Sequence, residues 1–514
     1  MSVSVSKAQD YSPKEISAGT YILRAVNPEN GQPTISLSST YNTDFLLPNT
    51  VLNLGRSYLN FAVTFPAQLA YALNAVHNGF LAPIDGIVLS TASGVRLVDM
   101  NNLPEFTKLT WRSMTNFEDF QSFPVHTSAA GFDCTIADAA HAAYSNVSEC
   151  AEAGHLFHRT RVTADGATAS ASFAAGAVCF TGEDRKTLDN IDDAYTGVSN
   201  ALAPFIATSS ATLANIPQMA YRVQLPLKMI YGSLLELDKD LYLGEQVRLT
   251  IRWNLGSKIG YAVPGASYVA ATTAATGLCP PVLATTDATV LPTISNVQLR
   301  IAVETNDAIA SAIKQKVMAD SGIQIRIPYT YVFKGVTSGV ANDTVTIIRK
   351  LNRGHGAKLV RVVAGVFAAA HSANSGGSYC NTYNYALGAA GVAPIFPKWQ
   401  SYRTFIDSKP LTDDILTLSD YFAYEYNKEK FRGSCIRSLR DFLQNPAIIE
   451  DFSGVPYAKD WPETDDIASG LDLSTEREFA LQVTAGSSAT IQPIYVFAIT
   501  QKGLSITREG ISLM

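Results

Sequence analysis

The stretch that decides the fold runs from Tyr221 to Asn254 and reads YRVQLPLKMIYGSLLELDKDLYLGEQVRLTIRWN. Both of its ends alternate with a period of two: the apolar residues are Val223, Leu225 and Leu227 at the start and Val247, Leu249, Ile251 and Trp253 at the end. This period is typical of half-buried strands. Between them, Leu234 to Leu243 predicts a short helix that Gly244 stops, too brief for the crossover of a parallel sheet. The stretch therefore predicts the closing edge of an antiparallel sandwich.

A similar set of elements begins again after a linker rich in Gly, Pro, Ala and Thr. Residues 297–304 alternate as a strand, and a helix follows with Asn306 as N-cap and Gly322 as the C-cap glycine. A helix near 419–431 takes a position comparable to one at 102–120 in the first half. The expected strands are 20–25, 34–38 and 58–65 in the first half, and 323–333, 344–351, 358–367, 478–484 and 490–500 in the second. The chain is predicted to be all-β with short helices, as two antiparallel sandwiches in tandem.

The length of 514 residues supports this division, because single cores stop growing at about 250 to 300 residues. Two Ala, Ser and Gly-rich segments supply little core and are expected to project as surface insertions. The predicted parts are an N-terminal arm (1–18), a first sandwich (19–255, with insertion 124–215), a linker (256–292) and a second sandwich (293–514, with insertion 368–394).

Composition restricts the classes of function. Charged residues make up 16% of the chain, against about 25% in an average soluble protein, so the surface is expected to be polar and uncharged or buried against partners. A net charge of −6 disfavours general nucleic-acid binding. The six cysteines are scattered without CxxC spacing, and the N-terminus has no apolar signal segment. The longest apolar run, Leu359 to Ala370, contains Arg361, so we expect no membrane span and assembly in a reducing cytoplasm.

Few residues suggest chemistry. The chain has no GxSxG, GxxxxGK[ST], HExxH, GxGxxG or DxDxDG motif. His155 and His158 have metal-like spacing, with His141 and Cys150 as conceivable further ligands, but solvated imidazoles explain them better. Turns and caps explain the three Asp doublets, at 192–193, 413–414 and 465–466. We expect no catalytic, cofactor-binding or metal site.

One basic cluster is the densest positive stretch, and it could face nucleic acid or an acidic neighbour. It consists of Lys428, Lys430, Arg432, Arg437 and Arg440. Glu425, Glu429 and Asp441 interleave with it, so we favour a solvated helix face.

Three segments resemble the double jelly-roll major capsid proteins of double-stranded DNA viruses. They are LPLKMIYGSLLELDKDLYLGEQVRLTIRWN (225–254), ISNVQLRIAVETNDAIASAIKQKVMADSGIQIRIPY (294–329) and FPKWQSYRTFIDSKPLTDDILTLSDYFAYEYNKEKFRGS (396–434). This lineage includes adenovirus hexon, tailless phages with internal membranes and large algal viruses. The chain is most similar to its smaller members, the virophage and polinton-like virus capsid proteins.

The resemblance implies a fold and a role. The fold is two tandem eight-stranded antiparallel jelly-roll sandwiches, and the role is a major capsid protein without catalytic residues or cofactors. The implied partners are further copies of the chain, as homotrimer and neighbouring capsomers, together with penton and minor capsid proteins. An internal membrane under the shell is left open, and no specific nucleic-acid binding is expected. The implied location is the virion, after assembly in the host cytoplasm or a viral factory.

Two alternatives stay open at this stage. One is a minor or vertex capsid protein, which copy number per particle would distinguish. The other is a carbohydrate-binding or carbohydrate-cleaving β-sandwich, for which Trp399, Trp461 and the Asp doublets are the hints.

Overall fold

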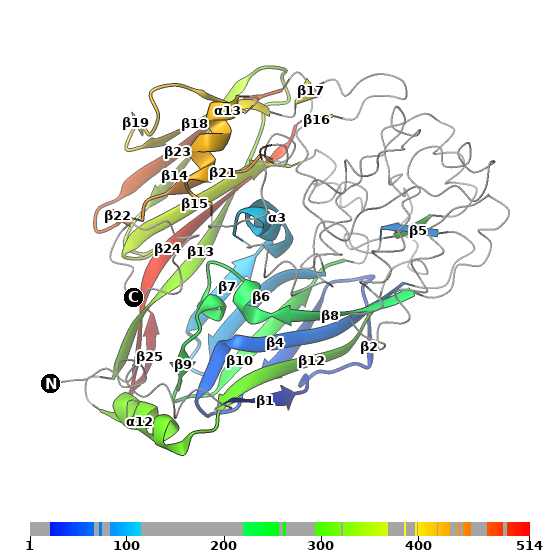
Figure 1. Cartoon of the computed structure of the whole chain (residues 1–514), viewed down its shortest axis with the longest axis vertical. Coiled ribbons are helices and arrows are strands. Elements are labelled where there is room, and N and C mark those ends of the chain that lie inside the picture. Colours follow the sequence, from blue (N-terminus) through cyan, green and yellow to red (C-terminus); the bar gives the residue numbers. More distant parts are fainter. Residues whose placement is uncertain are drawn as a thin grey trace.

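The computed structural model describes residues 21–65, 71–74, 83–114, 219–255, 261–263, 293–319, 322–367, 385–386, 396–397, 399–418, 420–431, 439, 442, 446–453, 470–486 and 491–513. Four larger antiparallel sheets and a few short helices account for most of this part of the chain (Figure 1). The predicted all-β class is therefore confirmed. The N-terminal arm 1–18 and the six cysteines lie outside the described residues.

The first sandwich consists of two facing sheets. One has the order β1 (Tyr21–Val26), β12 (Thr293–Glu304), β4 (Leu52–Phe65) and β8 (Met219–Pro226), with β2 (Thr34–Ser36) on β12 and β9 (Asp240–Leu241) on β4. The other has the order β3 (Tyr41–Leu46), β10 (Val247–Trp253), β6 (Ile84–Thr91) and β7 (Arg96–Asn101).

The second sandwich repeats this construction. One sheet has the order β13 (Ile323–Val336), β24 (Pro493–Thr507), β15 (Lys358–Val366) and β21 (Ile448–Asp451), with β22 (Leu471–Asp472) on β15 and β25 (Gly510–Leu513) on β24. The other has β14 (Thr344–Leu351), β23 (Arg477–Ala485), β18 (Trp399–Ile406) and β19 (Lys409–Pro410), with β20 (Leu416–Thr417) on β18. Two small ribbons join β5 (Tyr71–Asn74) to β11 (Tyr261–Val263) and β16 (Tyr385–Ala386) to β17 (Phe396–Pro397).

The strand order is the same in both sandwiches. If the eight principal strands of each are numbered along the chain, one sheet reads 1-8-3-6 and the facing sheet reads 2-7-4-5. Eight antiparallel strands divided over two sheets by such Greek-key connections form a jelly roll. The chain is thus two tandem jelly rolls, as the resemblance implied.

The predicted start of the second sandwich at residue 293 is wrong for one strand. Residues 293–304 do form a strand, but β12 pairs with β1 and β4 and is the eighth strand of the first jelly roll. Alternation of apolar and polar residues predicts a strand but not the strand with which it pairs. The long linker before residue 293 also suggested that a new domain begins there. The other predicted limits stay predictions, and most of both insertions and of the linker lies outside the described residues.

The stretch 221–254 also differs from its prediction. β8 and β10 belong to facing sheets, so the segment between them crosses from one sheet to the other. The predicted helix at 234–243 is only a 3-10 turn, Leu234–Glu236, followed by β9; another such turn is Leu227–Met229. Its leucines are buried in the core, and Ser233 caps the turn by accepting from Leu235 N. The spacing of these leucines therefore reflects their burial in the core and not a helical period.

Three α-helices, α3, α12 and α13, accompany the strands within the described residues. α12 (Asp307–Met318) connects the two jelly rolls, and Asn306 is its N-cap as predicted. Its C-cap is Ala319 and not Gly322. Gly322, with a φ of 57°, instead lies in the turn that leads into β13. α3 (Leu103–Met114) and α13 (Tyr421–Lys428) each follow the fifth strand of their jelly roll. α3 lies between the jelly rolls, whereas α13 lies on the second one alone (Figure 1). One continuous hydrophobic core spans both jelly rolls.

Candidate interaction surfaces

The residues first considered for chemistry do not form a site in the described part of the chain. His141, Cys150, His155 and His158 lie outside it, as do two of the Asp doublets. Asp413 and Asp414 lie in an exposed turn, where the Arg403 guanidinium donates to the main-chain oxygens of Thr412 and Asp413. No group of three or more His, Cys, Asp or Glu suited to a metal ion occurs among the described residues. Within the same residues no helix is long and apolar enough to cross a membrane.

The basic cluster is divided by the end of α13. Lys428 is exposed and pairs with Glu425 at 3.3 Å, as expected for a solvated helix face. Lys430 is only partly exposed, with 14% of its side chain accessible, and its Nζ donates to Glu450 Oε2 and Ile449 O, each at 2.8 Å. The prediction is therefore right for Lys428 and wrong for Lys430, because the chain turns toward β21 after the helix ends. The three arginines lie outside the described residues.

Glu450 organises the inner side of α13. Its side chain is 3% exposed and accepts from Thr404 Oγ1 at 2.7 Å and Tyr426 OH at 2.8 Å, besides Lys430. Burial lowers the pKa of Lys430, and the Glu450 charge acts in the opposite direction. A buried carboxylate with three donors fixes helix, strand β18 and strand β21 together. Sequence reasoning missed this residue, because Glu450 follows two isoleucines in an ordinary strand pattern.

A second polar cluster anchors β1 to the first jelly roll. Tyr21 OH donates to Asp240 at 2.9 Å, and the guanidinium of Arg56 lies 4.6 Å from the Tyr21 ring centroid. Arg56 also pairs with Asp238 at 2.7 Å, and Asn53 Nδ2 donates to both aspartates. Burial and the neighbouring Asp240 raise the pKa of Tyr21. The edge strand is thus fixed at its start.

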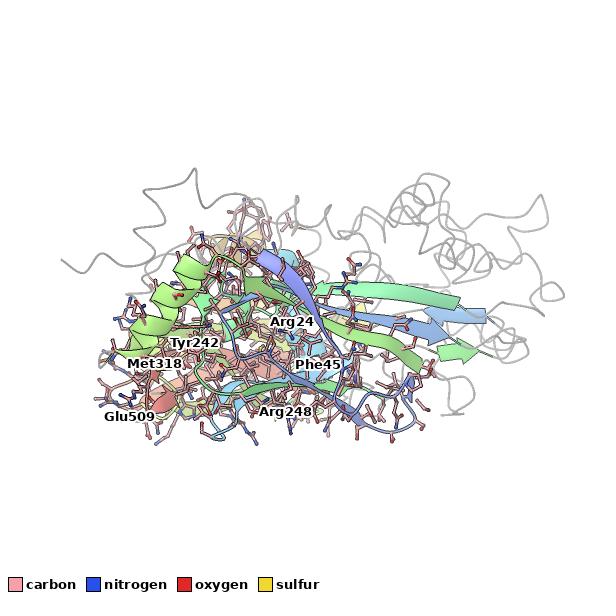
Figure 2. All side chains as sticks on the ribbon, turned by 90° about the horizontal axis from the view of Figure 1, so that it is seen from below. Arg24, Phe45, Tyr242, Arg248, Met318 and Glu509 are labelled. Carbon is pink, nitrogen blue, oxygen red and sulfur yellow. The ribbon has the colours of Figure 1, made fainter. Side chains whose placement is uncertain are left out.

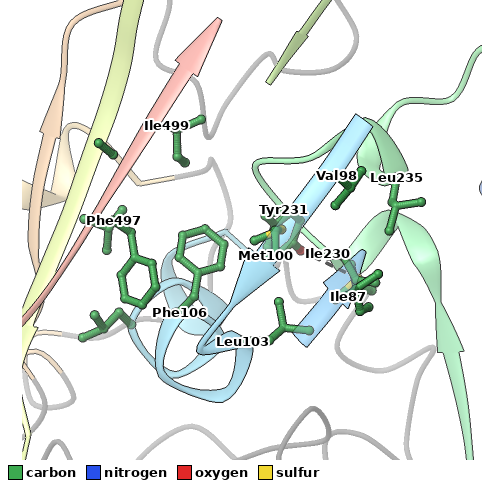
Figure 3. Close-up of a cluster of buried hydrophobic side chains, with 14 of the residues drawn as sticks. Ile87, Val98, Met100, Leu103, Phe106, Ile230, Tyr231, Leu235, Phe497 and Ile499 are labelled. Carbon is green, nitrogen blue, oxygen red and sulfur yellow. Dashed lines mark hydrogen bonds between the residues drawn. The ribbon is translucent and has the colours of Figure 1, made fainter. Parts of the chain in front are cut away.

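The joint between the jelly rolls combines apolar packing with a hydrogen bond. Phe106 of α3 packs against Phe497 of β24, with ring centroids 5.0 Å apart (Figure 3). Leu109, one turn on, lies against Gly365 of β15, so closely that a Cβ at Gly365 would clash with it. Thr330 Oγ1 of β13 donates to Gly232 O at 2.8 Å, and β7 lies beside β13. The two jelly rolls therefore pack directly against each other and share one hydrophobic core.

Eleven large apolar side chains are substantially exposed among the described residues. In the first jelly roll they are Ile22 and Leu23, and on the connecting helix Met318. In the second they are Val336, Val340, Ile348, Leu411, Ile415, Tyr421, Phe422 and Ile491. Exposed apolar groups that gather on one surface mark an interaction site, whereas scattered ones are normal.

Comparison with solved structures finds similar chain paths in virus capsids. The PBCV-1 virus capsid model is 10% identical, with 96% of each chain covered and a TM-score of 0.46. The Sputnik virophage structure is 11% identical, covering 97% of this chain and 89% of that one, with a TM-score of 0.47. The mavirus major capsid protein is 8% identical, covering 98% and 92%, with a TM-score of 0.45.

No protein-family model and no curated protein sequence matches the chain. The solved structures named above are at most 11% identical to the chain.

Proposed function

We propose that this chain is a major capsid protein whose copies form homotrimeric, pseudo-hexameric capsomers that tile the icosahedral shell of a double-stranded DNA virus. The observation that carries the proposal is the identical strand order of two jelly rolls that share one hydrophobic core. Three such chains around an axis would present six similar lobes. A block of this outline can pack hexagonally from a single gene product.

The joint between the jelly rolls supports a structural role. A shell subunit has to keep its lobes at a fixed angle, because neighbouring capsomers contact several lobes at once. Phe106, Leu109 and Gly365 make a close apolar contact at the joint, and the hydrogen bond from Thr330 to Gly232 adds a directional one. Domain pairs that move relative to one another usually have smaller and more polar interfaces.

The composition supports extensive burial against partners. Only 16% of residues are charged, and charged residues are depleted at the centre of stable interfaces. Obligate interfaces bury about 2,000 Å² or more. In this proposal the partners are further copies, penton and minor capsid proteins, the location is the virion, and the protein has no enzymatic role.

Particle imaging combined with native mass tests the proposal. The purified chain should form a stable trimer of 55.2 kDa subunits that assembles further into sheets or shells visible by electron microscopy. A monomer that never assembles and that binds or hydrolyses glycans would overturn the proposal in favour of the carbohydrate alternative.

A further inference from the structure

The joint inside the chain shows which elements of one jelly roll pack against which elements of the other. On the first jelly roll it uses the fifth strand, β7, and the helix that follows, α3. On the second it uses the first strand, β13, and the sheet face of the third and eighth strands, β15 and β24. The fifth-strand side of one jelly roll therefore meets the first-strand side of the next.

The same two sides recur at the free ends of the pair. The second jelly roll has its own fifth-strand side, formed by β19, β20 and α13. The first jelly roll has its own first-strand side, formed by β1, β12 and β4. In the described residues α13 packs on β20 and β21 of its own jelly roll, and its outer face is exposed.

Exposed apolar side chains gather on these two sides. Six of the eleven large ones lie there: Ile22 and Leu23 on β1, Leu411 and Ile415 beside β19 and β20, and Tyr421 and Phe422 at the start of α13. Leu23 is 49% exposed, and Tyr421 and Phe422 are each 57% exposed. The two sides that correspond to the joint inside the chain are therefore the ones that carry most of the exposed large apolar side chains.

The sheet face that includes β1 is exposed around Leu23, Ala25 and Arg300, whereas its counterpart on the second jelly roll is covered. Strand register places Ala25, Arg300 and Tyr58 in one row across β1, β12 and β4. This row faces away from the core, since the next residue along β4, Leu59, is fully buried. On the second jelly roll the equivalent face carries Phe497 and Gly365 and is covered by α3. Figure 2 shows β1, with Arg24 labelled, on the near side of the first jelly roll.

Charges at the rims of the two free sides are partly complementary. Arg300 is exposed in the outer row of the first-strand side, whereas Asp420 and Glu429 are exposed at the two ends of α13, with the exposed Lys428 beside Glu429. Opposite charges at the rim of an interface set its orientation and exclude wrong registers.

We infer that a second copy of this chain docks head to tail through these surfaces. Residues 411–422 and α13 of one copy cover β1 and the outer face of β1, β12 and β4 of the next copy, as α3 covers β15 and β24 within the chain. The inference rests on the proposed capsomer and specifies its contact. The contact is heterologous and closes into a ring after three steps.

Disulfide trapping tests the contact. A double variant, Leu23→Cys with Ile415→Cys, is oxidised with copper phenanthroline beside the two single variants and the unaltered chain. Covalent dimers and trimers specific to the double variant are expected on a non-reducing gel. The single variants control for the six native cysteines.

A charge substitution separates the inference from the proposed function. Phe422→Asp should lower the native mass from trimer to monomer with unchanged circular dichroism. Ile348→Asp, at a side chain that is 48% exposed against 57% for Phe422 and lies off the contact, should leave the trimer intact. The contact alone is overturned if the unaltered chain is trimeric, the Phe422→Asp variant stays trimeric, and the double-cysteine variant forms no disulfide between copies. An unaltered chain that stays monomeric overturns the capsomer and the contact together.

Discussion

The helices α3 and α13 occupy the same position in two jelly rolls of the same topology, yet their surroundings differ. Every described side chain of α3 is buried, because the helix lies between the jelly rolls. α13 buries Ala423, Tyr424 and Asn427 but exposes Tyr421 and Phe422. This difference is the basis for the inference that a second copy covers α13 as β15 and β24 cover α3 within the chain.

Truncation at the joint should have the largest effect on stability. Phe106→Ala removes the ring that packs on Phe497 and leaves a cavity between the jelly rolls, which should cost about 3 to 5 kcal/mol of unfolding free energy. Phe422→Ala, the matched change on α13, should stay within about 0.5 kcal/mol in the monomeric chain. Urea denaturation of both variants measures the difference, and equal costs would break the comparison.

Lys428, the last residue of α13, and Lys430, two residues further on, test the outer and inner sides of that helix. Lys430→Met leaves Glu450 buried without its ion pair and should cost about 3 to 5 kcal/mol. Lys428→Met removes an exposed pair with Glu425 and should change stability by less than about 0.5 kcal/mol. The denaturant midpoints of the two variants measure the difference in their loss of stability. A loss of stability in Lys428→Met as large as in Lys430→Met would refute the assignment.

Two glycines with positive φ separate backbone strain from packing at the joint. Gly232 has φ 69° and Gly94 has φ 90°, so an Ala at either position is strained. A Cβ at Gly232 would also clash with Thr330 Oγ1, whereas nothing lies within 4 Å of one at Gly94. Gly232→Ala should therefore cost about 1 to 3 kcal/mol more than Gly94→Ala. Thermal midpoints compare the pair, and indistinguishable midpoints would show that the joint adapts.

The smallest expected effect is a pH response at His355, in the turn between β14 and β15. Burial lowers its pKa, aided by Lys502, and its ring lies 4.9 Å from that of Tyr331. Because the unfolded chain binds this proton more readily, the second jelly roll should lose stability as pH falls through the range just below 6.5. His355→Gln should flatten this slope between about pH 5 and 8 in denaturation experiments. An unchanged slope would assign the response to other groups.

Strand alternation made much of the fold predictable from the sequence. The apolar face of residues 247–253 and the capped helix after Asn306 are found as expected, because periodicity and capping are local. The partner of residues 293–304 was not predictable, since pairing with β1 and β4 joins segments more than 200 residues apart. Leu234 to Leu243 resembles a helix only because its leucines fill the core.

The interaction surfaces were less predictable than the fold. Glu450 and Lys430 meet through a turn that no spacing rule describes, so their ion pair needs the structure. Ile22, Tyr421 and Phe422 look like ordinary apolar members of strand and helix patterns, and only their exposure distinguishes them. That exposure depends on which side of each jelly roll the rest of the chain covers.

The native mass of the unaltered chain by light scattering, across concentration and at low and moderate salt, tests the central claim most directly. The account predicts a stable trimer of 55.2 kDa subunits that grows into larger assemblies. A monomer at every concentration and salt condition would contradict it.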